Sequence, residues 1–341
     1  MVVTEPVPAT SDVLLDVRDL AVAYRDKAGE EVRLIDGVTF QLRRGEALGL
    51  AGESGCGKTT TALAMLGLLP TNLYRAEGTV DIDSTRGIMH VHRRTERGLR
   101  DLRWNTVSIV FQGAMNALDP VMRVSDQIGT AIRLHEPGVD QKTVDARVRE
   151  LFGYVGIAPG RARQYPHEFS GGMRQRVMIA LALACNPELI IGDEPTTALD
   201  VMMQAQILEL LERLRADFGL SMILITHDLS VLAETCDRVA IMYGGEIAET
   251  GSIAEVFGQP QHPYTRRLLG AFPTVGGPRE LAPAIPGIPP DPTSLPDGCR
   301  FAPRCHAAQA DCVRGRVPMH PVSDDRAARC LFAPWPGGAP L

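Results

Sequence analysis

The segment GESGCGKT, residues 52–59, carries glycines, a lysine and a threonine in the spacing G-x-x-x-x-G-K-[ST]. An apolar stretch precedes it and a helix-like stretch follows, which is the context in which this spacing binds phosphate. Glycines let backbone N–H groups close around phosphate oxygens, and a helix start adds partial positive charge. We expect Lys58 to reach the β and γ phosphates of a nucleotide and Thr59 to ligate Mg²⁺. The expected loop comprises Gly52, Glu53, Ser54, Gly55, Cys56, Gly57, Lys58, Thr59 and Thr60.

Two acids, Asp193 and Glu194, end the apolar segment LIIGDEP. A carboxylate at the end of a buried strand is costly unless it meets a cation, so Asp193 suits a Mg²⁺ shell. Glu194 is the natural residue to polarise an attacking water. His227 ends the next apolar segment, ILITH, and is expected to contact the γ phosphate. Gln112 follows the apolar SIVF and could ligate the metal or orient water.

A second anion-binding helix start is predicted in HEFSGGMRQR, where Ser170, Gly171, Gly172 and Met173 open the apolar run VMIALALA. The chain has one phosphate loop, so this start makes sense if it serves the nucleotide of another chain. Two subunits packed head to tail would then bury two ATP molecules. Each ATP would contact the loop around Lys58 of one subunit and the Ser-Gly-Gly start of the other.

Strands alternate with helices along the first 255 residues, which indicates an α/β protein with a parallel sheet. Residues 117–185 are mostly helical in pattern, with Val144, Val148, Leu151 and Val155 at helical spacing. The other predicted helices are 59–69 and 205–218, and the predicted strands are 13–24, 32–42, 46–52, 189–195, 222–228 and 238–245.

Composition limits the class of protein. The 341 residues have 45% hydrophobic and 22% charged content, as in ordinary globular proteins. The net charge of −6 disfavours a nucleic-acid partner. The sequence has no apolar run of about 18 residues and no basic-then-apolar signal at its start, so we expect a cytoplasmic protein.

After about residue 255 the composition becomes Pro-rich, and we expect an extended, loop-rich appendage that does not continue the sheet. Four cysteines lie there in the spacing C-x5-C-x6-C-x17-C. Sulfur-only ligation without a CxxC pair fits an iron–sulfur cluster at least as well as zinc, and unligated thiols remain a third reading. A bound metal would stabilise the fold of a tail that has too little apolar surface to fold by itself. The four are Cys299, Cys305, Cys312 and Cys330, whereas Cys56, Cys185 and Cys236 are expected to be small packing residues and His306 a surface residue.

Over residues 13–255 the sequence resembles the ATP-binding cassette (ABC) ATPases. The resemblance rests on six elements that occur in this order: GESGCGKT, Gln112, FSGGMRQR, LIIGDEP, TALD (197–200) and His227. The resemblance implies a P-loop NTPase core with an antiparallel β subdomain, a helical subdomain at about 115–185 and an irregular C-terminal Cys-containing tail. Its signature usually reads Leu-Ser-Gly-Gly-Gln, whereas Phe169 and Met173 flank the Ser-Gly-Gly core here.

The same resemblance implies a role for each motif residue. Tyr24 would stack on adenine, and Thr59, Gln112 and Asp193 would hold Mg²⁺. Gln112 would also sense the γ phosphate, Asp200 would signal across the dimer, Glu194 would be the catalytic base and His227 the switch. The partner's γ phosphate would lie against Ser170, Gly171, Gly172 and Met173.

Two further segments, FQGAMNALDPVMRV (111–124) and QHPYTRRLL (261–269), are similar to the ATP-binding subunits of dipeptide and oligopeptide importers. This branch implies a second homologous ATPase subunit in a heterodimer, two transmembrane permeases and an extracytoplasmic substrate-binding protein. The chain would lie peripherally on the cytoplasmic side of the plasma membrane. The cysteine tail resembles one that binds a [4Fe-4S] cluster, with Zn²⁺ as the alternative. The implied domains are 1–12 (a flexible start), 13–255 (nucleotide-binding) and 256–341 (importer-type C-terminal domain).

Other functions fit less well. Nickel or oligosaccharide could replace peptide as cargo, since members of this branch also move them. DNA-repair ABC proteins carry a long coiled coil between the positions of Gln112 and Ser170, but the gap here is 57 residues. Translation members usually carry two cassettes in one chain. A non-catalytic redox or metal-sensing module is disfavoured by the presence of both Glu194 and His227.

Overall fold

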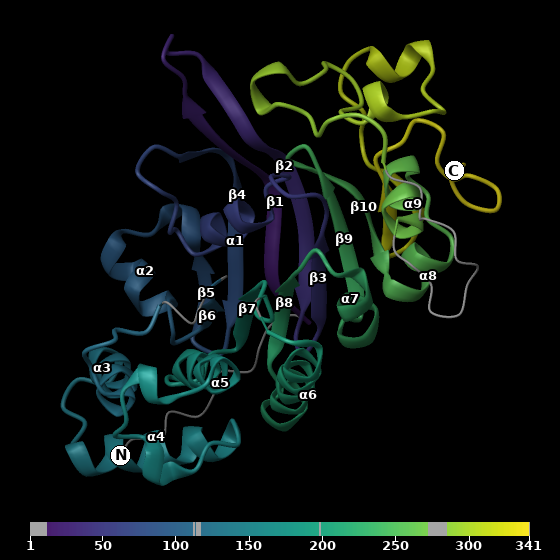
Figure 1. Cartoon of the computed structure of the whole chain (residues 1–341). Helices are drawn as coiled ribbons and strands as arrows, with labels where there is room; N and C mark the ends of the chain where they lie inside the picture. The colour runs from purple at the N-terminus through teal and green to yellow at the C-terminus, as the bar shows by residue number, and fades with distance from the viewer. Residues whose placement is uncertain (1–11, 112, 114–116, 198, 272–284, 341) are drawn as a thin grey trace. The chain divides into compact units, whose positions relative to one another are not determined.

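A computed structural model describes residues 12–111, 113, 117–197, 199–271 and 285–340 (Figure 1). The chain forms two compact units. The first contains Met1–Leu15, Leu42–Glu46 and Asp81–Ile225, and the second contains Asp16–Gln41, Ala47–Val80 and Thr226–Leu341. Each unit is built from segments that are far apart in the sequence.

Parallel strands form the centre of the first unit, in the order β6-β7-β8. They are β6 (Val107–Val110), β7 (Leu189–Asp193) and β8 (Ser221–Ile225), with Leu189 opposite both Val107 and Ser221. All residues of β7 and β8 are buried, so these strands are continuous apolar runs, as expected for a parallel sheet covered on both faces.

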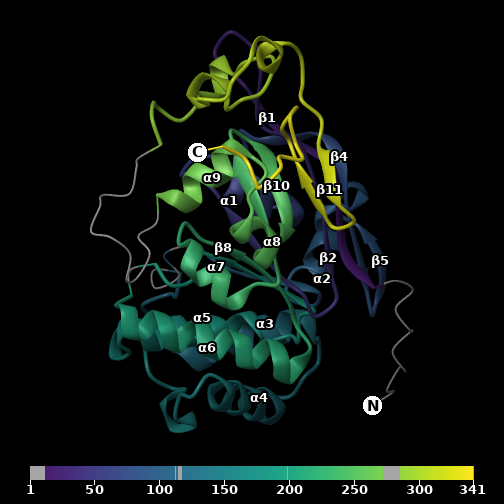
Figure 2. The same ribbon diagram turned by 90° about the vertical axis from the view of Figure 1, so that its right-hand side faces the viewer.

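Helices surround these strands. α5 (Gly171–Ala182) packs on β6, and α6 (Val201–Phe218) lies beside α5 in both views (Figures 1 and 2). α3 (Val124–His135) and α4 (Gln141–Tyr154) pack on each other and on α5. The predicted helical block at 117–185 is therefore confirmed.

A small hairpin and a short helix of the first unit had no clear signal in the sequence. β5 (Gly87–His90) pairs antiparallel with the end of β4 (Tyr74–Ser84), from Asp81 opposite His90 to Ser84 opposite Gly87. The single 3-10 turn Val91–Arg93 follows β5, and α2 (Glu96–Leu102) comes next.

The second unit holds the phosphate loop between β3 (Ala47–Ala51) and α1 (Lys58–Met65). β9 (Arg238–Tyr243) runs parallel to β3, and β10 (Glu246–Ser252) returns antiparallel to β9. β1 (Val13–Arg25) and β2 (Glu31–Arg43) are joined by a tight turn and neighbour each other in a separate sheet, with β4 beside β1. The remaining helices are α7 (Leu229–Thr235), α8 (Ile253–Gly258) and α9 (Pro263–Gly270).

The expectation that the tail does not continue the sheet is wrong for part of it. β12 (Arg326–Ala328) pairs antiparallel with β10, and β11 (His320–Ser323), labelled in Figure 2, pairs with β12. The sheet is thereby extended in the order β11-β12-β10-β9-β3. β12 has three residues and β11 has four, which is too few for their sequences to show a strand periodicity. Their register is set by tertiary contacts instead.

The main such contact is the carboxylate of Glu249, which is fully buried. It accepts hydrogen bonds from the backbone N–H groups of Gln261 and His262, both at 2.9 Å, and from Arg326 Nη2 at 2.9 Å. One side chain therefore joins β10, the start of α9 and β12.

The helix predicted at 59–69 begins at Lys58 and ends earlier, at Met65, because Gly67 takes a positive φ of 60°. Among the described residues, no helix has both the length and the apolar surface that a bilayer crossing requires.

Replacing Glu249 should release the end of the tail. Glu249→Ala leaves the Arg326 guanidinium buried without its carboxylate, so the free energy of unfolding should fall by about 3–5 kcal/mol. Glu234→Ala, an exposed acid on α7, is the matched control and should change stability little. Denaturant unfolding measures both, and equal stability of the two variants would contradict the anchoring role of Glu249.

Candidate functional site

The phosphate loop has glycines where a side chain could not fit. Gly52 has φ of 149°, and a Cβ there would lie 2.2 Å from the carbonyl oxygen of Met242. Gly57 caps α1 with φ of 106°, and its Cβ would lie 2.2 Å from Ile35 Cδ1. Both positions thus require glycine for space and for backbone conformation. The exposed tip of the loop is formed by Ser54 and Gly55.

Lys58 lies inside this loop, with only 7% of its surface exposed. Its Nζ donates to the carbonyl oxygens of Gly52 at 2.8 Å and Glu53 at 3.1 Å, and to the Cys56 sulfur at 3.6 Å. The ammonium group is therefore held across the loop where phosphate oxygens are expected. Cys56 is buried, as the sequence suggested, and burial raises the pKa of its thiol.

The loop is braced from outside by the C-terminal region. Arg304 donates to both carboxylate oxygens of Glu53, at 2.6 and 3.0 Å. The hydroxyl of Tyr264, a fully buried residue of α9, accepts the backbone N–H of Glu53 at 2.9 Å. Arg304 also donates to the Tyr243 hydroxyl at 3.2 Å. Glu53 is thus fixed through its backbone by α9 and through its side chain by the cysteine tail.

Arg300, which like Arg304 lies between Cys299 and Cys305, contacts the turn between β9 and β10, and this turn contacts the phosphate loop. The backbone N–H of Gly245 donates to the carbonyl of Cys56 at 3.0 Å. Arg300 donates to the Gly244 carbonyl and to Asp36 Oδ2, the latter at 2.8 Å. Arg300 and Arg304 both lie between Cys299 and Cys305, so the fold of this short segment bears directly on the phosphate loop.

The two acids lie at the end of β7, as predicted: Asp193 is its last residue and Glu194 follows directly. Asp193 is 2% exposed. Glu194 has φ of 48°, in the left-handed region that non-glycine residues rarely adopt, and is held there by two contacts. Its N–H donates to the carbonyl of Ile225 at 2.8 Å, and its Oε2 accepts from Thr197 Oγ1 at 2.9 Å. This backbone turn re-aims the carboxylate after the strand has ended.

The Ser-Gly-Gly segment begins α5 as predicted. Ser170 is exposed and caps the helix, since its Oγ accepts from the Met173 N–H at 3.4 Å. A Cβ on Gly172 would lie 1.9 Å from Met203 Cε, so this glycine permits the close approach of α5 and α6. Gly171 is the first residue of the helix.

The two unusual signature residues share one partner. The Arg161 guanidinium lies 4.7 Å from the centroid of the buried Phe169 ring. Arg161 Nη1 also donates to the Met173 sulfur at 3.0 Å and Nη2 to the Glu168 carbonyl at 2.9 Å. Phe169 and Met173 thus form one packing unit with Arg161 below the exposed Ser170.

Asp200 caps α6 by accepting the Met203 N–H at 2.9 Å. The next two residues, Val201 and Met202, are 82% and 71% exposed. Large apolar side chains this exposed at the start of a helix are typical of a surface that is covered in an assembly.

The other predicted site residues occupy several places. Tyr24 lies half-buried near the end of β1. His227 is exposed and lies two residues after the end of β8, with Asp228 capping α7 next to it. Thr59 and Thr60 follow Lys58 in the first turn of α1. Gln112 lies outside the described residues.

The four tail cysteines line one small cavity of about 20 Å³. None of the seven cysteines, all of which lie in the described part of the chain, is in a disulfide. Burial raises the pKa of Cys299 to about 12, and burial also raises the pKa values of Cys305 and Cys330. The exposed side chain of His306 contacts Arg267 instead of joining this group.

Sequence reasoning missed Arg161, Arg300 and Arg304. A single arginine in an irregular segment gives no periodicity or motif, and its partners lie far away in the chain: Glu53 is 251 positions from Arg304. Tyr264 belongs to the segment QHPYTRRLL, whose sequence does not indicate a contact with the phosphate loop.

Comparisons with known proteins agree with this geometry. Residues 35–197 match the ABC transporter family, and residues 248–312 match the C-terminal region of oligopeptide and dipeptide transporters. The chain is 43% identical to the oligopeptide transport ATP-binding protein OppD of Salmonella typhimurium, over 95% of each chain. It is 42% identical to the dipeptide transport ATP-binding protein DppD of Bacillus subtilis, over 93% of this chain and 94% of that one.

Solved structures support the same fold. The dimeric post-hydrolysis ATP-binding cassette MJ0796 with ADP and Pi has a TM-score of 0.62 and 26% identity, over 70% of this chain and 99% of that one. The structure of cbiO1 from Clostridium perfringens, part of the ABC transporter complex cbiONQ, has a TM-score of 0.61 and 27% identity, over 72% of this chain and 91% of that one. The predicted P-loop core with an antiparallel β subdomain is confirmed.

The contact of Arg304 with the Glu53 carboxylate can be tested with the variant Arg304→Met. The variant loses a bidentate charge-assisted pair and leaves an unpaired carboxylate beside the phosphate site, so ATP affinity should fall by about 5- to 30-fold. Arg314→Met, an exposed tail arginine paired only with Asp311, is the control. Titration with a fluorescent ATP analogue measures both. Unchanged affinity in Arg304→Met would show that the brace does not shape the loop.

Proposed function

This chain belongs to the ATP-binding subunits of oligopeptide and dipeptide ABC importers, and on that premise we propose how its residues turn ATP hydrolysis into transport. The observation that carries the proposal is the presence of two anion-binding helix starts on a chain with one phosphate loop. The loop around Lys58 binds ATP on its own chain. The exposed start at Ser170 binds the γ phosphate held by a second ATPase subunit.

In this proposal each residue acts on a stated part of the reaction. Lys58 and the loop N–H groups hold the β and γ phosphates, while Thr59, Gln112 and Asp193 hold Mg²⁺. Glu194 orients and deprotonates the attacking water, and His227 contacts the γ phosphate. Tyr24 stacks on adenine. Residues 13–255 form the nucleotide-binding domain, and residues 256–341 form the C-terminal domain that braces Glu53.

Exposed residues around Asp200 support pairing of two ATPase subunits. Ser170 is exposed, and so are Val201 and Met202 directly after Asp200. A second subunit that packs on these apolar side chains would remove them from water, which is favourable. ATP therefore completes an interface that is already apolar at one edge, and hydrolysis removes the phosphate that holds it closed.

The partners follow from the importer family. We propose a heterodimer with a homologous ATPase, bound to two permeases on the cytoplasmic side of the plasma membrane, with a substrate-binding protein on the other side. Three exposed apolar residues support a permease contact, since Phe111, Val121 and Met122 are 38%, 80% and 36% exposed. A helix of the permease with a matching apolar face would cover them.

We also propose that the cysteine tail holds a [4Fe-4S] cluster. Four soft thiolate donors around one cavity suit such a cluster. Sulfurs around a single tetrahedral zinc would lie about 4 Å apart, given Zn–S bonds of about 2.3 Å. Either group would use the same four thiolates, and the resemblance of this tail to one that binds a [4Fe-4S] cluster favours the cluster over Zn²⁺. The group would be structural, since it fixes the segment that carries Arg300 and Arg304.

Glu194→Gln tests the catalytic assignment. In the purified importer complex this variant should bind ATP but hydrolyse it about 10²- to 10⁴-fold more slowly, since the amide cannot accept the proton. It should also retain radiolabelled ATP through gel filtration, because the subunits stay closed. Glu212→Gln, an exposed acid on α6, should behave as wild type. Normal turnover in Glu194→Gln would remove Glu194 from this role.

The pairing surface has its own test in the same background. Adding Val201→Asp and Met202→Asp to Glu194→Gln places two charges where an apolar contact is proposed, so ATP retention should be lost while ATP still binds. Retention equal to that of Glu194→Gln alone would place the pairing surface elsewhere.

The metal in the tail can be identified on anaerobically purified protein. We expect a brown sample with about four irons and four sulfides per chain. Cys312→Ser should be colourless, and its ATP affinity should fall toward that of Arg304→Met, because the segment between Cys299 and Cys305 is no longer fixed. A colourless wild-type protein with one zinc per chain would decide for Zn²⁺.

A further inference from the structure

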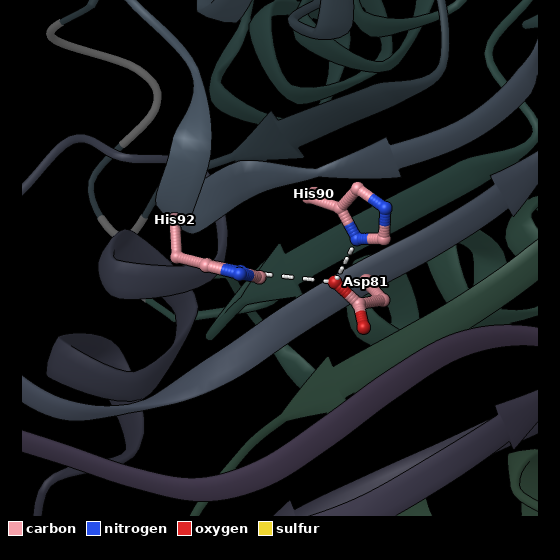
Figure 3. A group of neighbouring side chains, drawn as sticks. All are labelled: Asp81, His90 and His92. Atoms are coloured by element: carbon pink, nitrogen blue, oxygen red, sulfur yellow. Dashed lines mark hydrogen bonds and ion pairs between the residues drawn. The ribbon is translucent and has the colours of Figure 1, made fainter.

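We propose that Asp81, His90 and His92 form a binding site for one divalent transition-metal ion of the zinc class, separate from the nucleotide and cysteine sites. The three side chains point toward one another at the end of the β4–β5 hairpin (Figure 3). Among the described residues they are the one group of three or more His, Cys, Asp or Glu side chains whose ligand atoms all lie within 4.8 Å of one another.

Strand pairing brings the three ligands together. Asp81 of β4 lies directly opposite His90 of β5, so their side chains leave the same face of the hairpin. His92 follows two positions later, in the 3-10 turn Val91–Arg93. The turn keeps the second imidazole near the carboxylate after the strand has ended (Figure 3). This group is not evident from the sequence, because Asp81 lies nine positions before His90.

The distances suit a small ion after minor side-chain rotation. Asp81 Oδ1 lies 2.7 Å from His90 Nδ1 and 3.7 Å from His92 Nδ1. Ligand atoms around a tetrahedral zinc, bound at about 2.1 Å, are about 3.4 Å apart. One distance must lengthen and the other shorten by less than 1 Å. Rotation about side-chain bonds can supply such changes without moving the hairpin.

An unsatisfied imidazole supports a ligand here. His92 Nδ1 is buried and has no hydrogen-bond partner, and its side chain is only 11% exposed. A buried polar atom without a partner costs about 1–3 kcal/mol. A hydrogen bond between His90 and Asp81 explains those two residues, but it leaves His92 unexplained. A metal ion would satisfy His92 Nδ1 and the carboxylate together.

The donor set identifies the class of ion. Two imidazoles and one carboxylate favour Zn²⁺, Ni²⁺, Co²⁺ or Cu²⁺ over Mg²⁺ and Ca²⁺, which prefer oxygen ligands. The side chains of Asp81 and His90 are 32% and 45% exposed, so an ion can enter and keep water as a fourth ligand. The bound ion would cross-link β4, β5 and the turn at His92.

Co²⁺ titration of the full-length protein tests the site, with the protein freed of exchangeable metal by a chelator. Cobalt bound by nitrogen and oxygen gives visible absorption without the near-ultraviolet charge-transfer band of cobalt thiolates, so this site can be told apart from the cysteine tail. The wild type should bind one equivalent with the nitrogen and oxygen spectrum. His92→Ala and Asp81→Asn should each weaken this binding by roughly 100-fold or more, since each removes one of three protein ligands.

His167→Ala removes an exposed histidine outside the cluster and should leave the spectrum and affinity unchanged. Asp81→Asn keeps the shape of the side chain, so it tests ligation even if His92→Ala perturbs the turn. Zn²⁺ should also raise the thermal midpoint of the wild type more than that of either ligand variant. Equal cobalt spectra and affinities in the wild type, His92→Ala and Asp81→Asn would overturn the proposal.

Discussion

The whole account depends on how the chain holds the glycine-rich phosphate loop around the buried ammonium of Lys58. Gly52 and Gly57 remove the side chains that would block the loop, and Lys58 spans it through two carbonyls. A loop of this kind has no core of its own. Its shape is imposed from outside by Tyr264 on the backbone of Glu53 and by Arg304 on its carboxylate. The C-terminal region of this importer ATPase therefore contributes directly to the site that defines the family.

The first unit carries the residues that we propose act on phosphate and water. Strain at Glu194 turns its carboxylate away from the strand, and the contact of Gly172 with Met203 fixes the start of α5 against α6. Arg161 contacts both Phe169 and Met173, the residues that flank the Ser-Gly-Gly start, and Ser170 itself is exposed. These features are consistent with a chain that offers one complete phosphate loop and one half-site for a partner. In the proposed pairing, the exposed apolar side chains of Val201 and Met202 supply the hydrophobic contact.

The order of motifs allowed the P-loop fold, the helical block and the importer branch to be predicted, because each depends on local patterns. The buried strands β7 and β8 and the start of α5 at Gly171 were predicted from apolar runs and from the Ser-Gly-Gly sequence that opens the helix. The contacts that join distant segments could not be predicted. The pairing of β12 with β10 depends on the buried Glu249, and the brace on Glu53 depends on an arginine 251 positions away. Neither leaves a periodic signal, so both required the three-dimensional structure.

The central claim is that this subunit hydrolyses ATP only when a second subunit completes the pocket. The most direct measurement is the ATP hydrolysis rate per chain over a wide range of protein concentration, with the association state followed by sedimentation in the same samples. The account predicts a rate near zero where the chain is monomeric, and a rise that follows dimer formation or addition of the partner ATPase. A full, constant rate per chain in samples that sediment as monomers would contradict it.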